Sequence, residues 1–191
     1  MIHETVVTTV SKSGTPHVAP MGVRIENGFV LLMPFRPSTT CDNVIETGCA
    51  VVNFTTDVRV FAGCVTGRRD WPTLPASEVS CVRLDGALAH AELRLTSLAD
   101  DLVRPVLTMQ RVTQVTHGAF HGFNRAQAAV IEGAVLVSRL HLLPREKIDT
   151  EFAWLKIAVD KTAGPNEWQA WRWLTAAVAA HYERACAQET S

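Results

Sequence analysis

The feature that most constrains the fold is the order of two residue patterns along the chain. Short runs rich in β-branched residues fill the first half, and from Asn124 onward the apolar residues follow a helical period. Strands first and helices afterwards predict an α+β fold, with helices against one side or end of an antiparallel sheet or barrel. The 191 residues are enough to bury a core without disulfide or metal support.

Local signals place the expected elements of the first half. Asn27-Gly28 separates the apolar runs 21–25 and 29–33, which is the strongest short-range signal of a β-hairpin. Hydroxyl residues precede a short periodic stretch that ends at Gly48, which predicts a capped helix. Further strands are expected over residues 5–10, 17–20, 49–54, 84–95 and 106–115, with a loop over 67–80 and a short helix, capped by Asp57, that runs to Cys64.

The last third is expected to form three helices, at about 125–143, 148–162 and 166–187. Pro144 is predicted to end the first helix, and Gly164-Pro165 to separate the other two. Four tryptophans are expected in a core or a dimer contact because large aromatic side chains stabilise strongly when buried: Trp154, Trp168, Trp171 and Trp173.

Composition and charge exclude several classes of protein. The net charge of −1 argues against a nucleic-acid partner, which needs a basic face. The most apolar stretch, residues 126–143, contains charged and polar residues, so we expect a buried helix and no membrane span. Five scattered cysteines without a CxxC pair argue against a zinc ribbon or a disulfide framework and favour a reducing, cytoplasmic location. No secretory signal is expected, since no basic region followed by an apolar run opens the chain.

The segment from Phe35 to Asp57 has the residue types of an anion site. The first turn of a helix leaves backbone N–H groups unpaired and favours negative charge. Arg36 adds a planar cation, and the residues that follow add hydroxyl and amide donors: Ser38, Thr39, Thr40 and Asn43. This set could hold one phosphate group. Serine and threonine at a helix start serve as caps more often than as ligands, so both interpretations stay open.

The same segment resembles a known family pattern. Thr40, Asn43, Glu46-Thr47-Gly48 and Val51-Val52-Asn53-Phe54 resemble the T-x-x-N-I-x-x-T-G-x-x-V-V-N string of FMN-binding split-barrel flavoproteins, the flavin-reductase-like group. With Ala19-Pro20-Met21-Gly22 and Phe123-Asn124-Arg125-Ala126, the set resembles the domain-of-unknown-function 447 family.

The resemblance implies a fold and a function. The expected fold is an antiparallel split β-barrel of the FMN-binding type over residues 1–122, with a C-terminal helical region, 123–191, packed on the barrel. The expected function is that of an FMN-binding flavoprotein, an oxidoreductase with a small-molecule substrate, and a homodimer with the flavin near its interface. A link to methanopterin-type one-carbon metabolism is a further implication. The alternative is a flavin-binding carrier or sensor without turnover.

The resemblance also implies which residues contact the cofactor. The phosphate would be faced by Arg36, Ser38, Thr39, Thr40 and Asn43, and the isoalloxazine by Pro20, Met21 and Gly22. Gly22 suits close backbone approach to a ligand because it lacks a Cβ. The polar edge or the ribityl chain would be contacted by Asn53 and Asp57. Asn124 is either a helix cap or a contact, and Arg125 would reach the phosphate or a neighbouring subunit.

Two histidines and one cysteine are candidates for other chemistry. His117 and His121 have the i, i+4 spacing of some helical metal pairs, but no third ligand is recognisable and Gly118 weakens a helix, so no metal is expected. No histidine lies between Asp101 and Val115, where flavin reductases place one near the nicotinamide. No catalytic residue is assigned, and Asp57 and His121 are the only candidates for a proton donor. Cys41 would be a stabilised thiolate in the first helical turn, but no neighbouring base supports a nucleophile.

Overall fold

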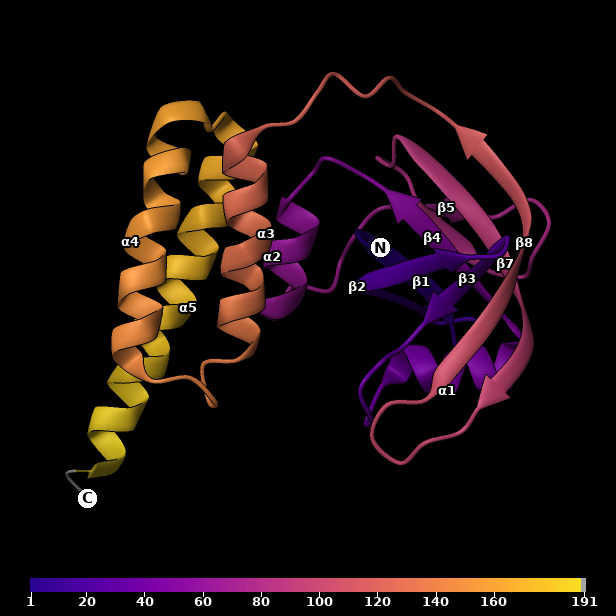
Figure 1. The fold of residues 1–191 in the computed structure, drawn as a ribbon, viewed down its shortest axis with the longest axis horizontal. Coiled ribbons are helices and arrows are strands. Elements are labelled where there is room, and N and C mark those ends of the chain that lie inside the picture. The colour runs from indigo at the N-terminus through magenta and orange to yellow at the C-terminus, as the bar shows by residue number, and fades with distance from the viewer. Residues whose placement is uncertain (190–191) are drawn as a thin grey trace. The chain divides into compact units, whose positions relative to one another are not determined.

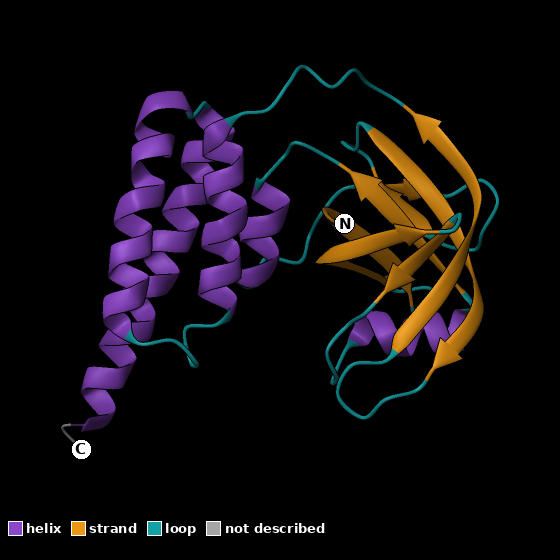
Figure 2. Cartoon of the chain, in the orientation of Figure 1, coloured by secondary structure: helices purple, strands orange, loops and turns teal. Residues whose placement is uncertain are grey.

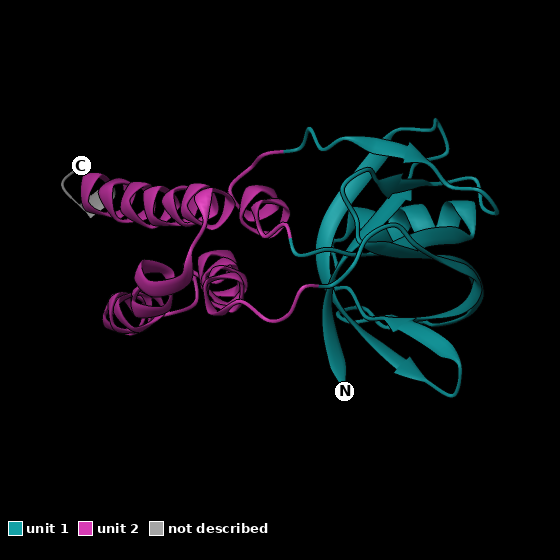
Figure 3. Cartoon of the chain, turned by 90° about the horizontal axis from the view of Figure 1, so that it is seen from above, with its two compact units in different colours: residues 1–56, 69–120 teal, residues 57–68, 121–191 magenta. Residues whose placement is uncertain are grey.

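The computed structural model describes residues 1–189, with side chains described through Ala187. The chain separates into two compact units (Figure 3). The barrel unit comprises Met1–Thr56 and Arg69–Phe120, and the helical unit comprises Asp57–Arg68 and the chain from His121 onward. The domain division at 122/123 and the packing of the helices on the barrel stay predictions.

The barrel unit is a closed barrel of six strands in the order β1-β2-β3-β8-β7-β4 (Figures 1 and 2). Every neighbouring pair is antiparallel. The predicted α+β fold with an antiparallel barrel is therefore confirmed. The strands are β1 Ile2–Val10, β2 Pro16–Glu26, β3 Phe29–Leu32, β4 Cys49–Phe54, β7 Ala89–Ala99 and β8 Val106–Thr116.

The turns follow the local chemistry of the sequence. Asn27 and Gly28 both have positive φ, 51° and 84°, as a two-residue hairpin turn between β2 and β3 requires. Gly48, at φ 72°, ends helix α1, Thr39–Thr47, in the left-handed conformation that glycine adopts at low cost. The two strands expected over 17–20 and 21–25 form the single strand β2, which pairs with β1 along its whole length, from Ile2 opposite Arg24 to Val10 opposite Pro16.

The loop expected over residues 67–80 and the long strand expected over 84–95 both differ in the structure. Residues 73–84 form a small hairpin, β5 Thr73–Pro75 and β6 Val82–Leu84. A turn after Leu84 separates this hairpin from β7. Side chains and backbone of this segment bond to outward-facing side chains of the barrel, such as Thr8 and Asn53. The barrel therefore has a buried polar layer outside its apolar interior.

The helical unit contains four helices among the described residues: α2 Arg59–Val65, α3 Arg125–Ser138, α4 Arg145–Thr162 and α5 Pro165–Glu189. Helix α3 ends five residues earlier than predicted, and Pro144 is the N-cap of α4 and does not end α3. Proline fits there because it has no N–H to leave unpaired at a helix start. No described helix is long and apolar enough to cross a membrane.

Aromatic packing in the helical unit centres on Trp171. This side chain is 3% exposed, and its ring lies 5.1 Å from that of Phe152. A Cβ at Gly133 would lie 3.1 Å from Leu174 Cδ1, so α3 approaches α5 closely at this glycine. The expected core packing is confirmed for Trp171. Trp154 is 71% exposed in the single chain, so it lies outside the core, and its alternative role in a dimer contact stays a prediction.

Candidate functional site

The first candidate site is the start of helix α1 in the barrel unit. The Ser38 hydroxyl accepts a hydrogen bond from the Cys41 N–H at 3.2 Å, and the Ser38 carbonyl accepts one from Asp42. Ser38 is thus the N-cap, which confirms the expected hydroxyl cap at this helix start. The N–H groups of Thr39 and Thr40 precede the first intrahelical bond, so the partial positive charge of the helix start is available to a ligand. Thr39 is exposed at this position.

Removing the Ser38 hydroxyl should loosen this helix start. We expect Ser38→Ala to lower the free energy of unfolding by about 1 kcal/mol, because one capping bond is lost. In a chain of this size, that corresponds to a fall in Tm of about 2–4 °C, measurable by thermal unfolding of the protein without ligand. Thr39→Ala is the matched control, since Thr39 is exposed and is not the cap. Equal losses in both variants would contradict the capping role.

Arg36 lies next to this helix start and is held in place from the opposite loop. Its Nη2 lies 2.9 Å from Asp100 Oδ1, and its Nη1 donates to the Asp101 carbonyl at 2.9 Å. The Arg36 backbone N–H donates to the carbonyl of Val103 at 2.9 Å. The Arg36 side chain is 26% exposed and that of Asp100 is 67% exposed. The guanidinium is therefore oriented, and its ionic partner is one that a bound anion can replace.

Two of the predicted phosphate residues face inward. Thr40 is 1% exposed, and Asn43 is 5% exposed and donates from Nδ2 to the Thr9 hydroxyl at 3.0 Å. The bond from Asn43 joins α1 to strand β1. Arg36, Ser38 and Thr39 form the accessible part of the predicted set. Together with the N–H groups of the first helical turn, they have the chemistry that fits a phosphomonoester.

The three residues predicted to face an isoalloxazine lie on β2. Met21 packs against the apolar interior of the barrel, so its side chain points inward, whereas Pro20 and Gly22 alternate to the other face. A Cβ at Gly22 would lie 2.7 Å from Ile2 Cγ2 on the neighbouring strand. Close strand packing therefore explains why glycine is required at this position, and a flavin contact by these residues stays a prediction.

Asn53 is part of the buried polar layer. Its side chain is fully buried, and its Nδ2 donates to the Val6 carbonyl at 3.0 Å and to the Thr8 hydroxyl at 3.1 Å. Its Oδ1 accepts from the Leu84 N–H at 2.8 Å. This geometry supports a role in joining β1, β4 and β6. A contact between Asn53 and a cofactor stays a prediction.

A second polar cluster, which we call the Glu92 chain, consists of Glu92, His90 and His117. Sequence reasoning did not find it. His90 Nε2 lies 3.1 Å from Glu92 Oε1, and His90 Nδ1 lies 2.8 Å from His117 Nε2. Glu92 and His90 are buried and His117 is exposed. The only local signal was the His-x-Glu pattern within an apolar strand, which places both side chains on one face.

The Glu92 carboxylate is held by a ring of donors. Burial alone would raise the pKa of Glu92, but hydrogen bonds outweigh it and lower the pKa to about 2. The donors are the backbone N–H groups of Ser77, Glu78 and Val79, the Ser77 hydroxyl and the His90 ring. Glu92 is thus a carboxylate at physiological pH, fixed inside the polar layer.

The remaining predicted residues lie in the helical unit. Asp57 Oδ1 accepts from the Arg59 N–H at 3.1 Å, and its Oδ2 pairs with Arg59 Nη2 at 2.6 Å. Asn124 accepts from the N–H groups of Ala126 and Gln127, so its interpretation as a helix cap is confirmed. Arg125 is exposed. Contacts of these three residues with a cofactor stay predictions.

A metal pair at His117 and His121 has no helix to support it. Residues 117–124 are not helical, so the i, i+4 spacing does not place these two imidazoles on one helical face. Among the described residues, no group of three or more candidate ligands is placed to hold a metal ion.

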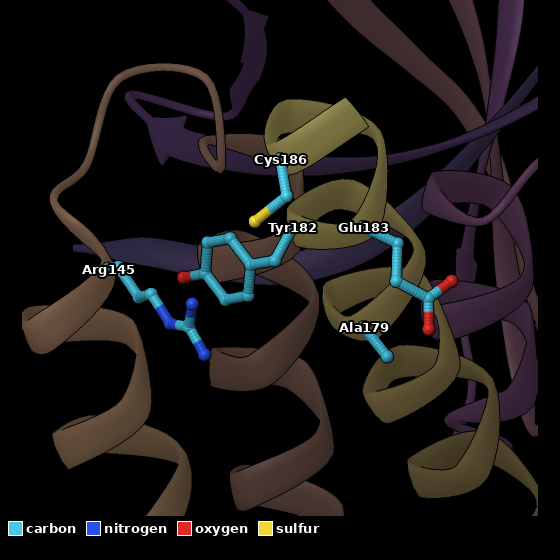
Figure 4. A pocket seen from close by; sticks show the side chains of 5 residues that line it. All are labelled: Arg145, Ala179, Tyr182, Glu183 and Cys186. Atoms are coloured by element: carbon cyan, nitrogen blue, oxygen red, sulfur yellow. The ribbon is translucent and has the colours of Figure 1, made fainter. Parts of the chain in front are cut away.

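The helical unit has a pocket of about 490 Å³, lined by Arg145, Ala179, Tyr182, Glu183 and Cys186 (Figure 4). The Arg145 guanidinium carbon lies 4.7 Å from the centre of the Tyr182 ring. Burial raises the pKa of Tyr182, and the nearby Asp149 carboxylate adds to this. Cation–π packing between α4 and α5 explains this arrangement, and Figure 4 shows Glu183 directed away from the Tyr182 ring.

Comparison with known families gives two matches that together span most of the chain. Residues 3–118 match the N-terminal domain of "Protein of unknown function (DUF447)", and residues 124–176 match the second domain of the same family. No curated protein matches this chain.

Solved structures share the fold. An FMN-bound DUF447 protein from Methanosarcina mazei is 20% identical and aligns with a TM-score of 0.79 over 92% of this chain and 94% of that chain. Flavoredoxin from Methanosarcina acetivorans is 13% identical, with a TM-score of 0.54 over 61% and 69%. Nitrilotriacetate monooxygenase component B from Bacillus cereus is 20% identical, with a TM-score of 0.54 over 64% and 73%.

Proposed function

The chain belongs to the DUF447 family, and on that premise we propose that it is a flavoprotein that binds FMN without a covalent bond. The observation that carries the proposal is the likeness, over 92% of the chain, to a family member whose structure contains FMN. The two less similar structures are a flavoredoxin and a monooxygenase component, and both cover about three fifths of this chain. All three share its barrel.

The start of α1 supports this proposal from the chain's own geometry. Arg36, Ser38 and Thr39 would hold the FMN phosphate, with the N–H groups of the first helical turn as further donors. Thr40 and Asn43 would position the helix from inside. When bound, FMN supplies electron and hydride transfer, and the protein supplies binding and orientation.

We further propose an oxidoreductase that acts on a small molecule and works as a homodimer with the flavin near its interface. Apolar side chains on three neighbouring strands support a dimer: Ile25 on β2, Phe29 on β3 and Val112 on β8 are 38–43% exposed. A link to methanopterin-type one-carbon metabolism and a cytoplasmic location belong to the same proposal. They are supported by the family resemblance and by the scattered cysteines, respectively.

A carrier or sensor without turnover is the second candidate. It is favoured by one observation, the absence of histidine between Asp101 and Val115. The two candidates are separated by mixing the FMN-loaded protein with NADH, NADPH or a reduced deazaflavin. Loss of flavin absorbance within seconds supports the enzyme, and flavin that stays oxidised with all three donors supports the carrier.

FMN binding itself is tested on purified protein by its absorbance spectrum and by calorimetric titration with FMN. We expect a flavin spectrum, or saturable uptake of one FMN per chain. A colourless protein that takes up no added FMN would remove the proposal, whatever the result with electron donors.

Arg36→Ala should weaken FMN binding. Charge-assisted hydrogen bonds contribute about 1.5–3 kcal/mol, which corresponds to a rise in Kd of about 10–150-fold. Riboflavin lacks the phosphate, so its affinity should stay nearly unchanged. Arg24→Ala is the matched control, because Arg24 belongs to the same unit, its side chain is 43% exposed, and it pairs only loosely with Glu26, at 4.0 Å. If Arg36→Ala weakened FMN and riboflavin equally, Arg36 would not be the phosphate ligand.

A further inference from the structure

The Glu92 chain connects a buried carboxylate with the surface. Glu92 is 0% exposed, His90 is 3% exposed, and His117 is exposed at the end of β8. The two imidazole planes are within 1° of parallel, with centres 5.0 Å apart. His90 Nδ1 and His117 Nε2 are 2.8 Å apart. The two rings therefore lie in one line and are joined by a hydrogen bond; they are not stacked face to face.

The chain of bonds fixes the tautomer of each ring. An ionised carboxylate can only accept, so His90 must carry its hydrogen on Nε2. A neutral His90 then has an accepting Nδ1, and His117 must donate from Nε2. His117 Nδ1 is therefore the atom left as a base, and it belongs to the exposed ring.

The same bonds give a path for one proton. When His117 Nδ1 takes up a proton, the hydrogen on His117 Nε2 can pass to His90 Nδ1. The positive charge then lies on His90, 3.1 Å from the Glu92 carboxylate. Attraction between opposite charges is stronger in this buried layer than at the surface, so the charge is stabilised at the inner ring. Passing the hydrogen back returns the proton to His117.

Charged groups near His117 change its pKa and therefore its readiness to take up a proton. Partial burial lowers the pKa of His117, and the positive charges of Arg83 and His90 lower it further. Arg83 lies on β6, and its Nη1 donates to the Leu84 carbonyl at 3.3 Å. At neutral pH, His117 therefore presents an unprotonated Nδ1 close to a cation that attracts an anionic oxygen.

We propose that the Glu92 chain is a one-proton relay, in which His117 Nδ1 exchanges a proton with a small molecule that bears an anionic or hydrogen-bonding oxygen. His117 is the residue that touches this molecule, and His90 and Glu92 are positioning residues that hold the tautomer and stabilise the charge. A role of the relay in a reaction rests on the proposed oxidoreductase function. In that function the flavin would transfer a hydride, and the relay would supply the proton to the substrate. The relay as such needs no cofactor.

The relay is tested on the FMN-free protein by following the 15N and 13C resonances of both imidazoles between pH 5 and pH 9. We expect both rings to be Nε2–H tautomers at high pH. We also expect the resonances of both rings to change together around one midpoint, because one proton is shared between them. Titration of His117 alone, with His90 unchanged, would overturn the relay, as would two rings that never titrate.

Variants sharpen this test. Glu92→Gln removes the charge that stabilises a protonated His90, so the shared midpoint should fall by at least one pH unit, a tenfold loss of proton affinity. Glu78→Gln is the matched control, since only the backbone of Glu78 contacts Glu92. If Glu92→Gln does not fold, the exposed variant His117→Gln replaces it and should abolish the titration of His90 at that midpoint. Because FMN is absent, failure of the relay and failure of flavin binding are separate results.

Discussion

Replacing Glu92 with glutamine is expected to lower the free energy of unfolding by about 3 kcal/mol at pH 7. Removing one partner from a buried charged network lowers the free energy of unfolding by about 3–5 kcal/mol, because the remaining groups lose a hydrogen bond and stay inaccessible to water. The carboxylate accepts from three backbone N–H groups, one hydroxyl and His90. A glutamine has one accepting oxygen in place of two, and its NH₂ group faces donors.

The pH dependence of stability gives an independent measure of the same network. The pKa of Glu92 is lowered to about 2 in the folded chain, against about 4.5 for the ordinary side chain. A lowered folded-state pKa adds stability that is present above the unfolded pKa and is lost as pH falls from about 4.5 toward 2. The interval corresponds to about 3 kcal/mol. We expect this acid loss in the natural chain and its absence in Glu92→Gln.

Urea unfolding at pH 7, 4 and 3 measures both effects. Glu78→Gln again serves as the control, because the exposed Glu78 side chain accepts none of these bonds. The network would be shown to be unimportant if Glu92→Gln lost less than 1 kcal/mol at pH 7, or if both variants lost stability in parallel on acidification.

The parts of the fold that sequence predicted correctly are those with local causes. Asn27-Gly28 needs no distant partner to form a hairpin turn, and Ser38 and Gly48 fix the two ends of α1 by their own backbone chemistry. The prediction that Pro144 ends the first helix was wrong, because Pro144 precedes the next helix. A proline is compatible with the position before a helix as well as with the position after one, and the sequence alone does not choose between them.

The buried polar layer could not be predicted because its bonds join distant segments. Glu92 on β7 meets the backbone of residues 77–79, and Asn53 on β4 meets Leu84. The segment over 67–80 has no hydrophobic period, so its polar residues indicated a loop. Its backbone N–H groups are in fact the partners of barrel side chains, which no local pattern records.

The candidate site shows what a family string encodes. Thr40, Asn43 and Asn53 carry most of the resemblance, yet all three side chains are buried. Their positions in the string therefore reflect requirements of the barrel and of α1. The residues left accessible for a phosphate, Arg36, Ser38 and Thr39, come just before the string. In this chain, the string predicts the architecture that creates the site more directly than it names the ligands.

Asn53→Leu tests this distinction, with an expected loss of about 3 kcal/mol in the free energy of unfolding. Leucine is close to asparagine in size but offers no polar atom. It leaves the Val6 carbonyl and the Leu84 N–H buried without their partner, and each such group costs about 1–3 kcal/mol. Hydrogen exchange of the Leu84 amide should also become faster, because its acceptor is removed.

Asn43→Leu is the graded control for Asn53→Leu. Asn43 is also buried, but its side-chain amide makes one bond to the Thr9 hydroxyl, which can turn toward another acceptor. We expect a loss of about 1 kcal/mol, measured by the same urea unfolding, and no change in exchange at Leu84. Equal losses in the two variants would mean that burial of an amide, and not the three-strand connection, sets the cost.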